Sequence, residues 1–352
     1  MIIVDIHLQQ FRSHHDSSFE FGEGVNIVVG PNGSGKTNLL EAILVVARGG
    51  SFRVGDKDLV EFNQPWMRLE AHMSDGSERI VKLTAQPPQK SYEINSKTYM
   101  RPRHEQLLPS VLFEPNHLML FHGSPEVRRN YLDEILEQTK PGYKSFRKNY
   151  RRVLAQRNAL LKTGQHSRQD FFPWDLRLSE LGAVMSRARH QLVEELNQTI
   201  TDLYTELSHS QDSVVLAYAT QFSIESYESQ LMSRLEQTLP QDQQRGFTSY
   251  GPHRDDLTTL FNAQPIELVA SRGEVRTLTL ALKVLELQTI EAATNKRPLL
   301  FLDDVFSELD GVRRKALTNY LQKYQTFLTT TDADMVVKHF TTSTILPLNS
   351  SG

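Results

Sequence analysis

Two adjacent carboxylates, Asp303 and Asp304, stand directly after the apolar run at residues 298–302, which is typical of a buried strand. Two further acidic residues, Glu308 and Asp310, follow within the next few positions. A buried carboxylate is costly unless a positive charge compensates it. The sequence must therefore supply a cationic partner for this acid pair.

The segment at residues 30–37 supplies that cation, because it matches the phosphate-loop pattern G-x-x-x-x-G-K-[ST] in full. A strand pattern precedes it at residues 25–29, and a helical pattern follows it at residues 38–48. Glycines in such a loop let backbone N–H groups surround phosphates, and the helix N-terminus adds a partial positive charge. The residues of the loop predicted to bind ATP are Gly30, Pro31, Asn32, Gly33, Ser34, Gly35, Lys36 and Thr37.

The residue types in the two segments predict ATP hydrolysis with Mg²⁺. Lys36 is predicted to contact the β and γ phosphates, and Thr37 to offer its hydroxyl to Mg²⁺. Asp303 is predicted as the Mg²⁺-associated acid at the end of a Walker-B strand, and Asp304 as the group that orients or deprotonates the attacking water. The alternative is that the two aspartates only cap the next helix.

A second anion site is suggested by Ser271-Arg272-Gly273-Glu274, which opens a helical run before the acid pair. Taken alone, Ser-x-x-Glu is a capping box, in which Ser271 caps the helix and Glu274 bonds back. The same helix N-terminus is also suited to the γ-phosphate of ATP held by another subunit. Phosphate loop, Ser-x-Gly-Glu helix and Asp-Asp strand end follow the order of ABC-type ATPases, whose heads sandwich ATP between two subunits.

The spacing of these groups predicts the architecture. Lys36 and Asp303 lie in opposite thirds of the chain, whereas a compact kinase would place them closer together. Strand and turn patterns dominate both ends of the chain, but the middle has apolar residues at helical spacings of three and four. We therefore predict an α/β fold, with an ABC-type P-loop ATPase head (lobe I, residues 1–123 and 246–352) and an inserted, mainly helical lobe II (residues 124–245).

Composition narrows the class of protein. The 352 residues are 39% hydrophobic and 23% charged, as in soluble globular proteins. No apolar run approaches the roughly 18–20 residues of a transmembrane helix, and no signal peptide is visible. The absence of cysteine excludes disulfides and thiolate sites and is compatible with a cytoplasmic protein. With a net charge of −3, any contact with nucleic acid must come from local patches.

One such patch is predicted at residues 138–169, which contain nine Lys or Arg and no Asp or Glu. The aromatic residues Tyr143, Phe146 and Tyr150 are expected to face the core of the lobe, so that the basic faces point outward. The alternative is an ordinary solvated helix face. The residues predicted to track DNA phosphates are Lys144, Arg147, Lys148, Arg151 and Arg152.

The chain resembles the RecF family of bacterial recombinational-repair ATPases, which are related to the SMC heads. The resemblance runs almost end to end, and the chain is far too short for the coiled-coil arms of SMC proteins. It is carried most specifically by Gly251-Pro252-His253-Arg254-Asp255-Asp256-Leu257 and Asp303-Asp304-Val305-Phe306-Ser307-Glu308-Leu309-Asp310, together with Phe11-Arg12-Ser13 and Lys36-Thr37-Asn38-Leu39-Leu40-Glu41-Ala42-Ile43.

The resemblance implies a weak, DNA-stimulated ATPase that forms a homodimer on DNA when ATP binds. It implies binding at single-strand gaps in double-stranded DNA, where the protein would help RecO and RecR to load RecA, and it implies no membrane. By position, Arg12 and Asn38 would contact the nucleotide. Ser271 and Gly273 would act in trans on the partner's ATP, and Asp310 would belong to the loop that crosses the dimer interface.

The chain departs from the family pattern at three places. The signature usually reads Ser-Gln-Gly-Gln-Gln but here is Ser271-Arg272-Gly273-Glu274-Val275, and residues 113–116 lack the glutamine of a glutamine loop. Residues 329–332 read Thr-Thr-Thr-Asp where many ABC proteins carry a switch histidine, so a threonine, predicted as Thr330, must substitute. The missing glutamine and the missing histidine predict slow hydrolysis, suited to a switch.

Two other functions compete with an ATP-switched DNA clamp. A P-loop kinase or other phosphotransferase is disfavoured by the Ser271 signature and the distant second acid. An SMC-like ATPase head serving another DNA-processing system is disfavoured by the short insertion. Phosphate transfer to a small acceptor would support the kinase, and DNA-dependent dimerisation without it would support the clamp.

Overall fold

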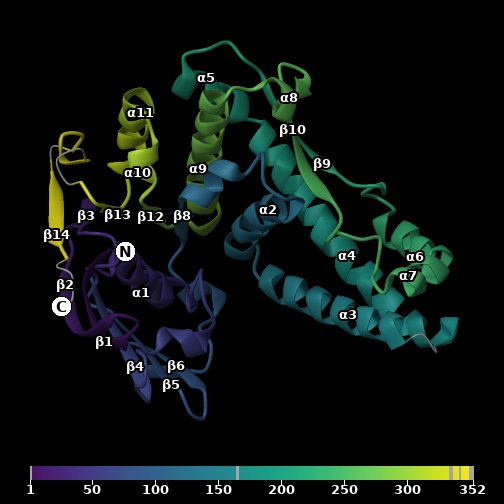
Figure 1. Ribbon diagram of the computed structural model, residues 1–352, viewed down its shortest axis with the longest axis horizontal. Helices are drawn as coiled ribbons and strands as arrows, with labels where there is room; N and C mark the ends of the chain where they lie inside the picture. Colours follow the sequence, from purple (N-terminus) through teal and green to yellow (C-terminus); the bar gives the residue numbers. More distant parts are fainter. Residues whose placement is uncertain (1, 164–165, 333–335, 341, 349–352) are drawn as a thin grey trace. The chain divides into compact units, whose positions relative to one another are not determined.

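The structure is a computed structural model that describes residues 2–163, 166–332, 336–340 and 342–348 (Figure 1). The chain forms two compact units. The head unit comprises Met1–Leu118 and Glu286–Gly352, and the helical unit comprises Met119–Leu285. The long helix α9, Arg272–Thr294, contributes residues to both units.

A five-stranded parallel sheet lies in the head unit, in the order β14-β3-β13-β12-β8. Its strands are β3 (Val25–Val29), β8 (Ser110–Phe113), β12 (Leu299–Asp303), β13 (Thr326–Thr330) and β14 (Ser343–Pro347). Every residue of β8, β12 and β13 is buried, which explains the nearly continuous apolar sequences of β8 and β12, while β13 buries three threonines beside its two apolar residues. Because the strands are parallel, the ends of β3 and β12 meet at one edge, where ligands bind in open α/β sheets.

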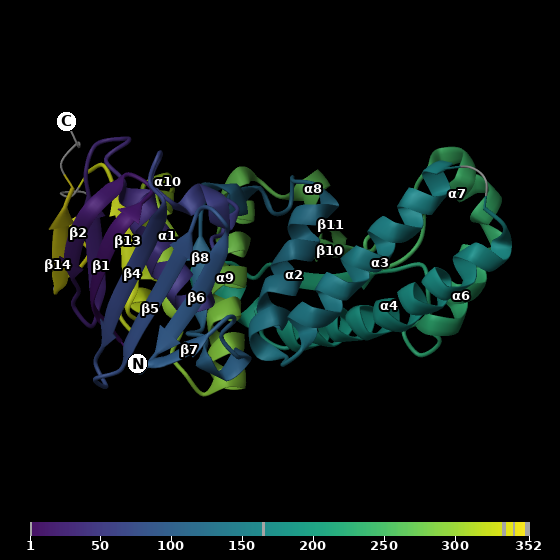
Figure 2. The same cartoon turned by 90° about the horizontal axis from the view of Figure 1, so that it is seen from below.

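A six-stranded antiparallel sheet forms the second layer of the head unit, and Figure 2 shows its strands edge to edge. Its strands are β1 (Ile3–Phe11), β2 (His14–Glu20), β4 (Trp66–Met73), β5 (Glu78–Thr84), β6 (Gln89–Ile94) and β7 (Lys97–Tyr99), in the order β2-β1-β4-β5-β6-β7. Helix α1, Lys36–Arg48, shares one apolar core with both sheets. This packing fixes the first turn of α1, and with it the phosphate loop.

Shorter elements complete the head unit. They are the helices α10 (Val305–Glu308) and α11 (Gly311–Leu321) and the 3₁₀ turns η1 (Asp56–Leu59), η2 (His104–Gln106) and η3 (Pro115–Met119). Helix α10 directly follows the acid pair, and η1 lies in the segment that leads from α1 to β4. Within the described ranges, no helix is long and apolar enough to span a membrane.

The helical unit is built mainly from six helices, as the spacing of its apolar residues predicts. They are α2 (Pro125–Thr139), α3 (Tyr143–Thr163), α4 (Arg168–Asn197), α5 (Ile200–Ser208), α6 (Tyr227–Gln237) and α7 (Leu239–Arg245). Helices α3 and α4 pack along each other (Figure 1). The unit also contains the short helix α8 (Ile266–Val269) and a sheet ordered β11-β10-β9, formed by β9 (Val214–Ala219), β10 (Asp256–Phe261) and β11 (Gln264–Pro265).

The units divide the chain differently from the predicted domains at both boundaries. The predicted division placed residues 119–123 and 246–285 in the head, whereas these residues belong to the helical unit in the structure, and the larger difference is the second. The reason is strand pairing, because β10 pairs antiparallel with β9 of the helical segment, from Asp256 opposite Ala219 to Phe261 opposite Val214. The sequence pattern of a strand that follows a helical region is the same whether the strand joins the sheet of the head or that of the helical unit.

Candidate functional site

The phosphate loop connects β3 to α1 and depends on its glycines. Gly33 and Gly35 have φ values of 84° and 92°, in the left-handed region that side chains disfavour. A Cβ on Gly35 would also lie only 2.9 Å from both His14 Nε2 and Ser13 Oγ. The loop can therefore turn tightly into the helix N-terminus only with glycine at these positions.

Lys36 is buried at the start of α1 with only 5% of its surface exposed. Its Nζ donates hydrogen bonds to the carbonyls of Gly30, at 2.8 Å, and Pro31, at 3.0 Å. Across the residues that the structure describes, it forms no ion pair, and the buried Ser34 Oγ has no hydrogen-bond partner. A buried ammonium and a buried hydroxyl that the protein leaves unmatched fit a loop that binds anionic phosphate.

The acid pair lies at the end of β12, next to this loop. Asp303 Oδ1 accepts hydrogen bonds from Thr37 Oγ1, at 3.0 Å, and from Thr329 Oγ1, at 2.8 Å. Asp304 has a left-handed backbone (φ 54°) and stands at the N-cap position of α10, where its side chain makes no capping hydrogen bond. Burial and the neighbouring Asp303 charge raise the pKa of Asp304, and Lys36 opposes them. The predicted cation is thus close enough to act on the acid pair.

The threonine that contacts the acid pair is Thr329. Its hydroxyl donates to Asp303 Oδ1 and accepts a hydrogen bond of 2.9 Å from the backbone N–H of Asp304. The predicted switch residue, Thr330, instead donates to the Asp332 carbonyl at 3.2 Å and accepts from the Asp332 N–H at 3.1 Å. Because parallel pairing places Thr329 opposite Asp303, the sheet register would have identified it.

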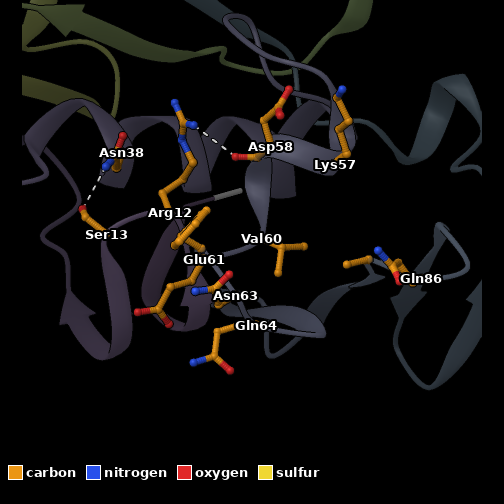
Figure 3. A pocket seen from close by; sticks show the side chains of 12 residues that line it. Arg12, Ser13, Asn38, Lys57, Asp58, Val60, Glu61, Asn63, Gln64 and Gln86 are labelled. Atoms are coloured by element: carbon orange, nitrogen blue, oxygen red, sulfur yellow. Dashed lines mark hydrogen bonds between the residues drawn. The ribbon is translucent and has the colours of Figure 1, made fainter.

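Arg12 lies at the tip of the β1–β2 hairpin in a left-handed conformation (φ 54°). Its Nε donates to Glu41 Oε2, and its Nη1 donates to the Asp58 carbonyl, each at 3.0 Å. Nearby, Asn38 Nδ2 donates to Ser13 Oγ at 2.8 Å. Arg12, Ser13 and Asn38 line a groove of about 720 Å³ (Figure 3). The other lining residues are Lys57, Asp58, Val60, Glu61, Phe62, Asn63, Gln64, Ala85 and Gln86.

The predicted signature residues, Ser271 and Gly273, lie at the start of α9 in the helical unit. The capping box is present, because Ser271 N donates to Glu274 Oε2 at 2.6 Å and Glu274 N donates to Ser271 Oγ at 3.3 Å. Asp310 lies in the head unit, where it caps α11 by accepting a 3.0 Å hydrogen bond from Arg313 N. That hydrogen bond lowers the pKa of Asp310.

The predicted DNA-binding residues all lie on α3, and four of them are exposed. The exposed residues are Lys144, Lys148, Arg151 and Arg152. Arg147 is instead half-buried and bonds Asp133, at 2.9 Å, and Glu137, at 2.8 Å. The expectation that all three aromatic residues face the core is wrong for Phe146, which is 38% exposed, while Tyr143 and Tyr150 are buried.

Similarity to known proteins agrees with this geometry. The sequence profile described as RecF/RecN/SMC N terminal domain matches residues 2–348. The DNA replication and repair protein RecF of Bacillus cytotoxicus is 32% identical over 95% of this chain and 93% of its own length. The RecF protein of Shouchella clausii is 33% identical over 94% of this chain and 93% of its own. The chain belongs to the RecF family.

Solved structures of RecF proteins have the same fold. The recombination mediator protein RecF-ATPrS in the RecFOR pathway superposes with a TM-score of 0.86, at 29% identity, over 95% of this chain and 93% of that one. RecF-ATP in the same pathway gives a TM-score of 0.82 at 28% identity, over 94% and 92%. An SMC head bound to the C-winged helix domain of ScpA, at 16% identity and a TM-score of 0.53, shares the fold alone.

The predicted family and the α/β ABC-type head are therefore confirmed. As a member of the RecF family, the chain is a DNA replication and repair ATPase. Sequence reasoning identified Lys36, Thr37, Asp303 and Asp304, which lie together in the head unit. It missed Thr329, whose hydroxyl joins the two acids.

Proposed function

We propose that the head unit binds ATP with Mg²⁺ and hydrolyses it slowly as a switch. The observation that carries the proposal is the 3.0 Å hydrogen bond between Thr37 Oγ1 and Asp303 Oδ1, beside the buried Lys36. A hydroxyl and a carboxylate brought together at a phosphate loop are the oxygen ligands that Mg²⁺ takes there. RecF relatives have been solved as RecF-ATP and RecF-ATPrS, which supports the same ligand here.

Each residue then has a role in hydrolysis. Lys36 contacts the β and γ phosphates, while Thr37 and Asp303 hold Mg²⁺, which neutralises charge on the phosphate oxygens when bound. Asp304 orients the attacking water, and its raised pKa makes its carboxylate a better proton acceptor than an exposed aspartate. Thr329, in place of Thr330, fixes the positions of both acids through its hydrogen bonds to the Asp303 side chain and the Asp304 backbone.

The groove beside Arg12 is the proposed place for the sugar and base of the nucleotide. Asn38, the residue after Thr37, lines the groove, and so does the guanidinium of Arg12. Its volume of about 720 Å³ is within the range of small-molecule sites in proteins. Arg12 and Asn38 therefore keep the nucleotide-binding role that the family resemblance assigned to them.

We propose further that ATP joins two copies of the chain. The N-terminus of α9 at Ser271 and Gly273 would bind the γ-phosphate held by the partner copy, because helix N-terminal N–H groups favour anions. Asp310 would lie at that interface. In this scheme the dimer binds gapped DNA in the cytoplasm and acts with RecO and RecR in loading RecA, as the family resemblance implies.

Light scattering tests the proposal with wild type and Asp304→Asn, each with and without ATP and Mg²⁺. ATP is expected to shift the wild type from monomer to dimer, and Asp304→Asn is expected to hold the dimer because turnover is lost. Lys36→Ala is the control that should remain monomeric. If all three remain monomeric although wild type binds ATP, the role of the Ser271 helix as a trans anion site is refuted.

The exposed cations of α3 are the proposed phosphate-tracking surface. Removing Lys148, Arg151 and Arg152 together is expected to reduce the slope of log K against log salt by about 3, because each phosphate contact contributes about 0.9. The matched control removes three exposed arginines elsewhere in the helical unit, Arg177, Arg187 and Arg234. Fluorescence anisotropy with gapped DNA measures the slope, and an unchanged slope would exclude this surface.

A further inference from the structure

A carboxylate that the proposed reaction does not use lies completely buried beside the nucleotide site. Glu41 is in α1, downstream of the phosphate loop, and has no exposed surface. Its Oε2 accepts the 3.0 Å hydrogen bond from Arg12 Nε, and its Oε1 accepts one from Ser51 Oγ. With both oxygens bonded from different directions, the carboxylate cannot rotate without losing a partner.

The hairpin tip that carries Arg12 contacts one face of α1 at three successive points. His14 Nε2 donates to the Gly35 carbonyl at 3.3 Å, Ser13 accepts from Asn38, and Arg12 donates to Glu41. The partners are the N-cap Gly35 and, within α1, Asn38 and Glu41, each three residues from the next, so consecutive partners are neighbours on the helix surface. The tip and the first turns of α1 therefore form one connected unit.

Arg12 is the member of this unit that reaches the groove. Its backbone N–H donates to the Leu59 carbonyl at 3.0 Å, and Nη1 donates to the Asp58 carbonyl (Figure 3). A guanidinium has five N–H donors in a rigid fork, so fixing Nε and Nη1 also fixes the direction of the Nη2 donors. The side chain remains 23% exposed, on the wall of the groove.

We propose that Glu41 is a positioning residue for nucleotide binding, acting through Arg12. It holds the guanidinium by Nε, so that the Nη2 donors are presented to the ATP in the groove before ATP arrives. This inference rests on the proposed function of the head unit. Ser51 supports it by holding the second carboxylate oxygen.

A purely structural role explains the arrangement less well. Replacing a buried ion pair by apolar residues of similar volume is often neutral or stabilising, so stability alone does not require this pair. Arg12 also adopts a left-handed conformation (φ 54°), which is unfavourable for a residue other than glycine. Backbone strain together with a buried charge is the pattern of a side chain held in place for a ligand.

A double-mutant cycle on ATP affinity tests the inference, using calorimetric titration of the full chain with ATP and Mg²⁺. Glu41→Gln and Arg12→Ala are each expected to weaken binding about tenfold, the scale of one charge-assisted hydrogen bond. The double variant is expected to bind no more weakly than Arg12→Ala alone. Ser51→Ala should weaken binding only about twofold to threefold, because the Arg12 bond remains.

Two results would overturn the inference while leaving the proposed function intact. One is that Glu41→Gln binds ATP with wild-type affinity while Arg12→Ala binds it more weakly. The other is a double variant in which the two losses multiply, because Glu41 would then act independently of Arg12. If wild type itself binds no ATP, or binds it as well as Lys36→Ala does, the proposed function fails first.

Arg12→Lys keeps the test decisive if Glu41→Gln does not fold. A lysine keeps the charge and can pair with Glu41, but it lacks a fork that serves Glu41 and a ligand together. It is expected to bind ATP as weakly as Arg12→Ala. Wild-type affinity in Arg12→Lys would show that the direction of the fork is irrelevant and would overturn the inference.

Discussion

The two units of the molecule treat buried charge in opposite ways. In the head unit, the nearly buried Lys36 bonds only backbone carbonyls, and none of the described residues forms an ion pair with it. In the helical unit, the fully buried Arg157 bonds Asp175 at 2.6 Å and Asp242 at 2.9 Å. Within the described part of the chain, the helical unit thus pairs its own buried cation with carboxylates, although Arg157 Nη2 has no hydrogen-bond partner, whereas the head leaves its buried cation without an ion pair.

Whether a buried cation has a carboxylate partner within the protein distinguishes a cation that stabilises the fold from one that can bind a ligand. Arg189 repeats the pattern of the helical unit, since it is 3% exposed and bonds both oxygens of Asp133, at 2.8 and 3.0 Å. The Arg12–Glu41 pair in the head is intermediate, because its carboxylate is buried but its guanidinium reaches the groove. Lys36 feels the charge of Asp304 but forms no ion pair with any described residue, so it can still take an external anion as a direct partner.

The largest expected effect is the loss of the buried pairs in the helical unit. Arg157→Met is expected to lower the free energy of unfolding by about 3–5 kcal/mol, because it leaves Asp175 and Asp242 buried without their cation. Urea unfolding measures it in a Trp66→Phe background, where Trp174 of the helical unit is the remaining tryptophan.

Two controls make the comparison between the units direct. Arg152→Met changes an exposed arginine of the same helix and should stay within about 0.5 kcal/mol of wild type. Lys36→Met applies the equivalent change to the head and is measured in a Trp174→Phe background, where Trp66 is the remaining tryptophan. It should lower the free energy of unfolding by under about 1 kcal/mol while abolishing ATP binding. A large loss of stability in Lys36→Met would remove the distinction between the two units.

A pH effect of somewhat smaller size is expected at His253. Its Nε2 donates to the Thr248 carbonyl at 3.1 Å, its Nδ1 accepts from the Tyr150 hydroxyl at 2.6 Å, and burial lowers its pKa to about 4 from an ordinary value of 6.5. The unfolded chain therefore binds the proton first. The contribution to stability is complete above about pH 6.5 and is lost as pH falls toward 4, by about 3 kcal/mol.

The measurement is the difference in unfolding free energy between wild type and His253→Gln at pH 7 and pH 4. Glutamine can donate and accept hydrogen bonds but does not titrate. The nearby Asp255, whose pKa is raised by burial, is present in both proteins and cancels in the difference. If the difference in unfolding free energy between the two proteins does not become smaller at low pH, His253 is not held neutral in the folded protein.

Local patterns predicted the head site because its chemistry lies in short segments. The phosphate loop has its own motif, and an apolar run ending in two aspartates favours a strand end near that loop over a simple helix cap. The choice between Thr329 and Thr330 could not be made, because every residue of β13 is buried and its sequence has no alternation to show which side chain faces the acids.

Pairs that join distant segments were beyond the reach of such patterns. Arg147 reads as one cation among many on α3, yet its partner Asp133 is on α2. Glu41 reads as a polar position in an apolar helix, and only the folded hairpin shows that Arg12 meets it. Residues 246–285 could not be assigned to a unit, because an apolar strand pattern does not specify which sheet it joins.

The smallest expected effect is a gain of stability in the head. Burial and the Asp303 charge raise the pKa of Asp304 above its ordinary value of 3.8, so its ionised form opposes folding. Asp304→Asn is therefore expected to raise the free energy of unfolding by up to about 1 kcal/mol at pH 7. The gain is small because the half-buried carboxylate is partly screened by solvent.

The sign of this effect reverses the rule of the helical unit, where removing a buried charge destabilises the fold. The folded protein binds the Asp304 proton more tightly than the unfolded chain, so wild type loses stability as pH rises through the raised pKa. The advantage of Asp304→Asn should accordingly vanish below about pH 4. Urea unfolding at pH 7 and pH 3.5, followed by Trp66, measures it. A loss of stability at pH 7 would mean that Asp304 is satisfied by the protein, as Asp133 is, whose pKa Arg189 holds low against burial, and that it is not held ready for the reaction.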